Sequence, residues 1–199
     1  MMASARKPID RRKQTVEAAA KSFAMFGYKA TTMDLIAKLA GVGKGTIYTF
    51  FATKEELFEE IIRQLTCEIK EVADEKIDRS KPFFENLNNA LHGVLQFRQK
   101  HELFMKLNQE LWDVRTPAVQ EALDNIEKAI VGFTEQEVRR GMEQGELVSD
   151  NPELTAYLIF RTYIALAIEW GRKREPLSRE EISGHITRLF QHGLQETTR

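Results

Sequence analysis

The sequence predicts an all-α protein of about nine helices, with a three-helix N-terminal unit fused to a larger C-terminal helical bundle. Apolar residues recur at helical spacing along almost the whole chain, and no alternating apolar and polar run typical of a strand stands out. Proline and glycine are sparse, with 5 and 11 in 199 residues. The boundary is expected after residue 54, which gives domains 1–54 and 55–199.

Three short helical segments make up the N-terminal unit. The first has an apolar face from Val16 to Phe26 and ends where Gly27 suits a helix C-terminus. Thr31 and Thr32 then predict the start of a second helix through Leu39. Three glycines between residues 41 and 45 leave room for only about two helical turns after them, over 44–51.

The bundle is predicted from capping residues and apolar periodicity. Thr53 with Glu56 reads as a capping box that opens a long helix reaching Ile77, and Ser178 with Glu181 reads as another. Pro117 and Pro152 suit first-turn positions. Further helices are expected near 83–100, 101–112, 116–141, 152–171 and 178–195.

The distribution of charge favours a polyanionic partner. Residues 1–54 hold ten Lys and Arg against three Asp and Glu, whereas the remainder holds 19 against 27. A basic segment on an acidic body suggests a surface for a polyanion, and composition alone leaves nucleic acid, a membrane surface and a solvated basic tail as alternatives. No apolar run is long enough to span a membrane, the polar N-terminus does not read as a signal peptide, and the single Cys67 excludes an internal disulfide. A cytoplasmic protein without a membrane partner is therefore expected.

The stretch from Thr31 to Phe51 has the spacing of a helix-turn-helix. Ala37 is the small residue at the helix contact, Gly41 tolerates the turn, and Ile47 anchors the second helix. The residues expected to pack inward are Leu35, Ile36, Leu39, Ile47 and Phe50, with Phe51 also in the core. The residues left outward are Lys44, Thr46, Tyr48 and Thr49.

This stretch resembles the N-terminal signature of tetracycline-repressor (TetR) type regulators. The residues that carry the resemblance are Phe26-Gly-Tyr28, Thr31-Thr32, Ile36-Ala37, Gly41-Val-Gly-Lys-Gly-Thr-Ile-Tyr48, Phe51 and Lys54-Glu-Glu-Leu57. The family implies an all-α homodimer that binds double-stranded operator DNA through its third helix and an effector in the C-terminal bundle. The function expected from it is a ligand-released repressor on an inverted-repeat operator. Gly43 departs from the family, where many members have a serine that caps the recognition helix.

The resemblance implies roles for individual residues in DNA binding. Thr32, Tyr48 and Lys54 would hold phosphates, and Lys44, Thr46 and Thr49 would lie in or beside the major groove. The expected DNA contacts are Thr32, Gly43, Lys44, Gly45, Thr46, Tyr48, Thr49 and Lys54. Arg6, Lys7, Arg11 and Arg12 could add further contacts from the N-terminal arm or the first helix.

An enzyme is not expected. Residues 41–46 superficially resemble a phosphate-binding loop, but Lys38 and Gly45 occupy positions that such a loop gives to a glycine and a hydroxyl residue. The four histidines show no metal-ligand spacing, and Cys67 has no obvious activating partner. The sequence therefore predicts no catalytic residue, no metal site and no cofactor.

Large soft side chains in the central helices suggest an effector pocket. The candidate lining residues are Phe97, Phe104, Trp112, Phe133, Tyr157, Phe160, Arg161 and Ile164. Arg161 lies in an otherwise almost uncharged helix, where a buried guanidinium needs either an internal carboxylate or an acidic effector. The second possibility would suit an acyl compound or another lipophilic anion. The alternative is an effector-independent DNA-binding factor with a purely structural bundle, which would lack a cavity of about 300 Å³ or more.

The last two helices are expected to form the dimer contact. Two apolar stripes support this, one with Ile164, Ala165, Ala167 and Ile168, the other with Ile182, Ile186, Leu189, Phe190 and Leu194. A ligand between the central helices is expected to displace the long helix that begins near Thr53, and so to change the spacing of the two DNA-binding units.

Overall fold

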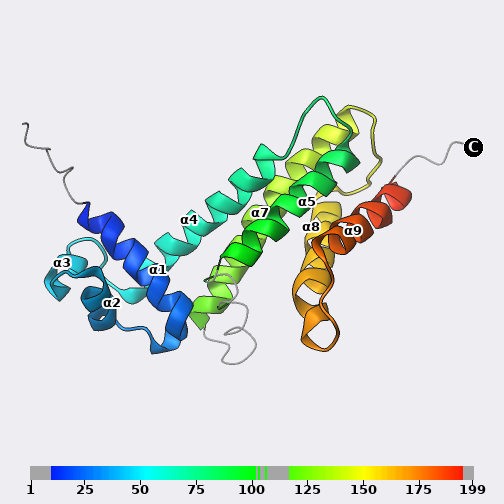
Figure 1. The fold of residues 1–199 in the computed structure, drawn as a ribbon. Helices are drawn as coiled ribbons and strands as arrows, with labels where there is room; N and C mark the ends of the chain where they lie inside the picture. The colour runs from blue at the N-terminus through cyan, green and yellow to red at the C-terminus, as the bar shows by residue number, and fades with distance from the viewer. Residues whose placement is uncertain (1–9, 102, 104–105, 107–116, 195–199) are drawn as a thin grey trace, which may run out of the picture. The chain divides into compact units, whose positions relative to one another are not determined.

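The computed structural model describes residues 10–101, 103, 106 and 117–194, and these residues are helical with no strand (Figure 1). The all-α prediction is confirmed. The helices are α1 (Arg11–Ala30), α2 (Met33–Ala40), α3 (Lys44–Tyr48), α4 (Lys54–Glu75), α5 (Phe83–Lys100), α7 (Pro117–Glu143), α8 (Pro152–Ile164) and α9 (Arg179–Leu194). The helix expected over 101–112 falls mostly outside the described residues. None of the described helices is long and apolar enough to cross a bilayer.

The chain divides into two compact units. The first comprises residues 1–63 and 102–120, and the second comprises residues 64–101 and 121–199. The division falls inside α4, whereas the sequence placed the domain boundary at residue 54. The first turns of α4 belong with the N-terminal helices because Leu57 and Phe58 are buried there, at 0% and 1% exposure.

The core of the first unit is an aromatic cluster between α1 and α4. The ring of Phe23 lies 5.7 Å from that of Tyr28 and 5.0 Å from that of Phe58. Val16 and Ala19 continue the buried face of α1, as the sequence predicted. Burying rings of this size accounts for much of the stability available to so small a unit.

The end of α1 is determined by one glycine. Gly27 has φ +81°, a conformation that disfavours residues with a Cβ, and it breaks the regular helix before the last turn. The buried hydroxyl of Thr31 donates to the Gly27 carbonyl at 2.8 Å and lies 3.1 Å from Ser22 Oγ. The predicted role of Gly27 is confirmed, although helical residues continue to Ala30.

The core of the second unit is built from α5, α7, α8 and α9. Its fully buried residues include Val138 of α7 and Ile186 of α9, both at 0% exposure. Ile182 and Phe190 lie in the same core. The dimer stripe expected on α9 is therefore wrong for Ile182, Ile186 and Phe190, because these side chains pack against their own chain. Leu189, at 62% exposure, lies on the other face of α9.

The helix expected over 152–171 changes its form near its end. The α-helix stops at Ile164, and Ala165–Glu169 form a π-helical turn followed by a 3-10 turn at Trp170–Arg172. The Trp170 indole then donates to the Glu175 carbonyl at 3.1 Å, which stabilises the reversal toward α9. The predicted capping box at the start of α9 is confirmed, since Ser178 and Glu181 exchange backbone-to-side-chain hydrogen bonds of 2.8 and 3.2 Å.

Candidate nucleic-acid interface and bundle cavity

Helix α2 is positioned by a cap at each end. The Thr32 side chain accepts from the Leu35 N–H at 3.2 Å, and Asp34 places a negative charge in the positive first turn. At the other end Gly41 has φ +62°, and the N–H of Val42 donates to the Ala37 carbonyl at 3.1 Å. These caps define where the turn to α3 begins.

Helix α3 is held on α2 by one apolar side chain. Ile47 is fully buried and meets the buried face of α2, which includes Ile36 and Ala37. Gly43 is the N-cap residue of α3 and supplies no side-chain hydrogen bond. Because glycine at this position costs only a few tenths of a kcal/mol relative to a side-chain cap, the short helix still forms. The predicted helix-turn-helix is therefore present, with its small, turn and anchor residues in place.

The outward face of α3 gathers most of the residues predicted to bind DNA. Tyr48 is 45% exposed, Lys44, Gly45 and Thr49 are exposed, and Thr46 is half-buried. The Thr49 hydroxyl donates to the Thr46 carbonyl at 2.6 Å, which leaves its methyl group and acceptor capacity outward. This face therefore offers hydroxyls, methyl groups and one ammonium to a partner.

Two residues expected in the core lie on this surface instead. Phe50 is 38% exposed and Leu39 is 47% exposed, whereas Phe51 is buried as expected at 2%. The helix α3 ends at Tyr48, and the irregular backbone after it places Phe51 inward. For Phe50 the error came from extending helical periodicity past the end of α3, whereas Leu39 lies within α2, on its exposed side.

Lys44 forms an ion pair across the turn. Its Nζ lies 2.9 Å from Asp34 Oδ2, and both side chains are exposed. The hydrogen bond to Asp34 raises the pKa of Lys44 above its usual value, so the ammonium is kept charged. Exposed pairs of this kind are weak, so a phosphate can displace Asp34 at little cost.

Lys54 lies differently from the expected phosphate ligand. Its Nζ donates to the carbonyls of Tyr28 at 2.9 Å and Thr31 at 3.1 Å, and it lies 4.1 Å from the centre of the Tyr28 ring. Lys54 therefore has an intrachain role, and its expected contact with a phosphate stays a prediction. The sequence could not reveal it, because the acceptors are backbone carbonyls more than twenty residues away.

The arginines of α1 are also engaged within the chain. Arg12 lies 3.2 Å from Glu60 and 5.0 Å from the centre of the Phe51 ring, and Arg11 donates to Gln14 at 3.1 Å. Arg6 and Lys7 lie outside the described residues. The expected contribution of these four residues to DNA binding stays a prediction.

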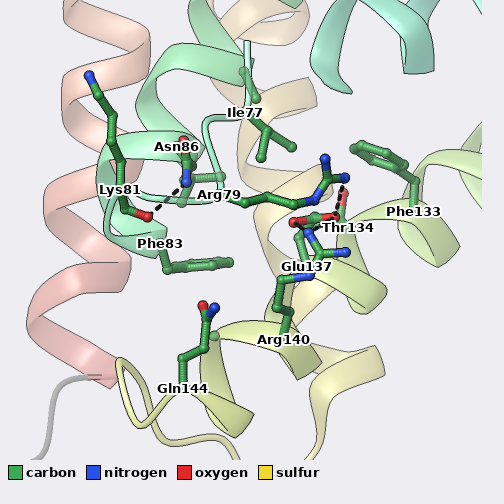
Figure 2. Close-up of a pocket in the computed structure, with 13 residues that line it drawn as sticks. Ile77, Arg79, Lys81, Phe83, Asn86, Phe133, Thr134, Glu137, Arg140 and Gln144 are labelled. Carbon is green, nitrogen blue, oxygen red and sulfur yellow. Dashed lines mark hydrogen bonds and ion pairs between the residues drawn. The ribbon is translucent and has the colours of Figure 1, made fainter. Parts of the chain in front are cut away.

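A small cavity lies in the second unit, between α5, α7 and the loop before α5 (Figure 2). Its volume is about 70 Å³, and Phe83, Phe133 and Leu87 give it apolar walls. Arg79 and Arg140 reach Glu137 from two sides, at 4.0 and 2.7 Å, so the charges at this site compensate one another. The cavity is smaller than the roughly 300 Å³ of a typical small-molecule site.

The predicted effector-binding residues are dispersed. Phe133 lines the small cavity, Phe97 stacks on His101 with ring centres 3.9 Å apart, and Ile164 packs on the core. Phe160 is half-buried, and Tyr157, at 39% exposure, lines an open groove between α7 and α8. Phe104 and Trp112 lie outside the described residues.

Arg161 is not buried. Its side chain is 45% exposed and lies 3.6 Å from Glu127 and 4.0 Å from Glu169, so the internal-carboxylate alternative is confirmed. Arg98 of α5 has a buried Nε and was not among the residues predicted to bind the effector. A signal was present, because Leu91, Leu95 and Arg98 follow the i, i+4, i+7 spacing of one helix face.

Comparison with known proteins assigns both parts of the chain. Residues 16–61 match the family model described as bacterial regulatory proteins, tetR family, and residues 80–194 match the tetracyclin repressor-like C-terminal domain. The transcriptional regulator YhgD of Bacillus subtilis is 47% identical over 186 residues, covering 94% of this chain and 97% of that protein. These matches are regulators of transcription, which confirms that the chain is not an enzyme.

Solved structures share the fold at lower identity. The regulator FadR from Bacillus subtilis, in complex with stearoyl-CoA, has a TM-score of 0.75 at 22% identity and covers 91% of this chain and 98% of its own. The fatty acid degradation regulator FadR from Bacillus halodurans has a TM-score of 0.75 at 20% identity, with coverages of 94% and 98%.

Proposed function

The chain belongs to the TetR family of bacterial transcriptional regulators, and we propose that it is a dimeric repressor that binds an inverted-repeat operator and is released by a lipophilic effector. The observation that carries the DNA-binding part is the outward face of α3, where Tyr48 and Thr49 are exposed while Ile47 is buried. A short helix held by one anchor presents its remaining side chains to the major groove.

In this proposal the residues of the helix-turn-helix divide into two groups. Tyr48, Thr32 and the Gly43 amide contact phosphates, which determine affinity and register. Lys44, Thr46 and Thr49, with the backbone of Gly45 close by, lie along the base edges. Lys54 contributes by holding the start of α4 against the end of α1, and so orients the unit that carries α3.

The dimer of this proposal uses the outward faces of α8 and α9. Leu154, Leu158 and Leu189 are 50%, 46% and 62% exposed, an unusual density of exposed leucines on two neighbouring helices. Two such faces related by a two-fold axis can form a four-helix interface. The buried residues Ile182, Ile186 and Phe190 of α9 are not part of this proposed interface.

The effector of this proposal is a lipophilic anion. The FadR structure, 22% identical to this chain, has the same fold and is in complex with stearoyl-CoA, which supports an acyl compound as the effector. The small cavity between α5 and α7 is too small for an acyl chain, so an effector held there must separate the helices. Such a separation would act on the second unit, where α4 ends, and α4 continues without a break into the DNA-binding unit.

A second candidate function is an effector-independent DNA-binding factor with a structural bundle. The small cavity agrees with it, whereas the open groove of about 720 Å³ between α7 and α8 argues against it. The two candidate functions are distinguished by adding a panel of fatty acids and acyl-CoA thioesters to the protein–DNA complex. Release of DNA by any member supports the repressor with an effector. Full retention of DNA with the whole panel supports the second candidate.

The DNA-binding proposal is tested by selecting sequences from a random duplex pool with the full-length protein. We expect an inverted repeat to be enriched, and Tyr48→Phe to weaken the selected and random duplexes alike by about tenfold, or about 1.4 kcal/mol. Thr46→Ala and Thr49→Ala should change base preference at single positions by about 1–3 kcal/mol. Tyr157→Phe, an exposed tyrosine of α8, is the matched control and should bind as wild type. Absence of any enriched sequence would contradict the proposal.

A further inference from the structure

Two polar side chains, Tyr163 and Arg98, approach each other in the apolar interior of the second unit. Tyr163 of α8 is 7% exposed, and its hydroxyl has no hydrogen-bond partner. The Nε of Arg98, on α5, is likewise buried without a partner. Burial raises the pKa of Tyr163 to about 12, and the charge and hydrogen-bonding approach of the Arg98 guanidinium oppose this rise, so the guanidinium lies close to the phenol. Buried polar groups left unpaired cost folding free energy and call for an explanation.

Arg98 also differs from the arginines on the neighbouring helices. Arg139 and Arg140 of α7 face Glu135 and Glu137, and Arg161 of α8 faces Glu127. Among the residues that the structure describes, no carboxylate lies within 4.0 Å of Arg98. A half-buried guanidinium without a counter-ion is unfavourable, and an anion supplied from outside would relieve it.

The backbone beside Tyr163 is irregular. Helix α8 changes to a π-helical turn at Ala165, two residues after Tyr163. Turns of this kind are rare, and they are found frequently at functional sites because they redirect side chains. The walls around the pair are apolar, since Leu95 of α5 and Ile159 of α8 are 2% and 3% exposed.

From this arrangement we propose that Arg98 and Tyr163 bind the carboxylate of a long-chain fatty acid inside the second unit. This inference rests on the proposed effector function; it places the effector's charged group at Arg98 and Tyr163, which do not line the small cavity between α5 and α7. The guanidinium donates to one or both carboxylate oxygens, and the protonated phenol donates to one of them. The acyl chain then lies against the apolar residues of α5 and α8, which separate to admit it.

A carboxylate fits this pair better than a thioester does. An ionised carboxylate offers two charged acceptor oxygens, which matches the planar fork of an arginine and leaves room for a second donor. A thioester carbonyl is a single neutral acceptor and leaves the guanidinium without a counter-ion. The free acid and its thioester therefore distinguish this site from one that holds an acyl-CoA.

The test measures binding of palmitate, hexadecanol and palmitoyl-CoA to lipid-free, full-length protein by calorimetry. We expect Arg98→Met to weaken palmitate binding at least tenfold and Tyr163→Phe to weaken it several-fold. Arg161→Met, the matched control with an exposed arginine, should bind palmitate as wild type. Hexadecanol has the same chain without the charge and should bind wild type and Arg98→Met equally.

Three results would overturn the inference: no palmitate binding to wild type, equal palmitate affinity in wild type and Arg98→Met, or an equal loss in Arg161→Met. Should Arg98→Met fail to fold, wild-type protein still decides, because bound palmitate labelled at C2 must show nuclear Overhauser contacts to a tyrosine ring that disappear in Tyr163→Leu. Release of DNA by palmitoyl-CoA, together with palmitate binding that does not depend on Arg98, would leave the proposed repressor standing and remove this site. Palmitate binding through Arg98 without release of DNA would support this site and contradict the proposed release of the repressor by an effector.

Discussion

The ammonium of Lys54 donates to the backbone carbonyl of Tyr28 at 2.9 Å and lies over the ring of the same residue, 4.1 Å from its centre. Lys54 is the first residue of α4, and Tyr28 lies just beyond the break at Gly27. Next to it, the Tyr28 hydroxyl donates to Glu55 at 2.6 Å. The first turn of α4 is thus attached to the end of α1 by two consecutive side chains.

This attachment predicts a stability role for Lys54. Lys54→Met removes the hydrogen bonds to the Tyr28 and Thr31 carbonyls, so we expect the free energy of unfolding to fall by about 1–3 kcal/mol. Urea denaturation followed by circular dichroism measures it. Lys44→Met, whose ammonium is exposed and paired only with Asp34, is the control and should change stability by less than about 0.5 kcal/mol. Equal stabilities for the two variants would show that the Lys54 contacts contribute little.

The turn between α2 and α3 gives a second prediction through two glycines that differ only in backbone conformation. A Cβ at Gly41 or at Gly45 would meet no atom within 4 Å, but Gly41 has φ +62° while Gly45 lies within α3. Gly41→Ala should therefore destabilise the protein by about 1–2 kcal/mol. Gly45→Ala should leave stability unchanged or raise it by up to about 1 kcal/mol. Thermal unfolding of both variants checks the difference, and a loss in Gly45→Ala as large as in Gly41→Ala would contradict it.

A pH dependence follows from the Tyr28–Glu55 hydrogen bond. Donation from the Tyr28 hydroxyl holds the pKa of Glu55 below its usual value of 4.5. Below this value the unfolded chain takes up a proton that the folded chain still excludes, so stability rises with pH in that range. The contribution is present above the unfolded-state pKa and is lost as pH falls through the folded-state pKa.

Tyr28→Phe should remove this part of the acid sensitivity while keeping the aromatic cluster. Denaturant unfolding at several pH values from 3 to 6 measures it, and the difference from wild type should shrink toward the acid end. Because Glu55 is exposed, we expect an effect below about 1 kcal/mol. Tyr48→Phe, which loses an exposed hydroxyl, is the control and should follow the wild-type curve. A constant offset across the whole range would contradict the linkage.

The proposed dimer predicts the effect of charges on the exposed leucines. Leu189→Glu and Leu158→Glu should produce folded monomers, because these side chains are 62% and 46% exposed and do not support the core. Sedimentation velocity measures the assembly, and we expect operator affinity to fall at least tenfold with it. Leu39→Glu on α2, at 47% exposure, is the control and should stay dimeric. An unchanged dimer in both variants would place the interface elsewhere.

Local signals were sufficient to predict the helices of this chain. Thr32 and Gly41 cap α2, Pro152 begins α8, and Ser178 with Glu181 caps α9, as their residue types indicated. Each of these interactions joins residues only a few positions apart, so the sequence contains both partners. The family resemblance, confined to the first quarter of the chain, added the DNA-binding function.

Long-range packing decided which side chains became available for function. Apolar periodicity alone did not distinguish Ile186, buried in its own core, from the exposed Leu189 three residues later. Nor could the sequence tell that Arg161 is exposed beside carboxylates while Arg98 has a buried Nε and lies close to Tyr163. The sequence by itself determined where helices begin and end, because caps and periodicity act over one or two turns. Only the tertiary structure decided what each face meets, since a charged or apolar side chain acquires its partner from residues that are distant along the chain.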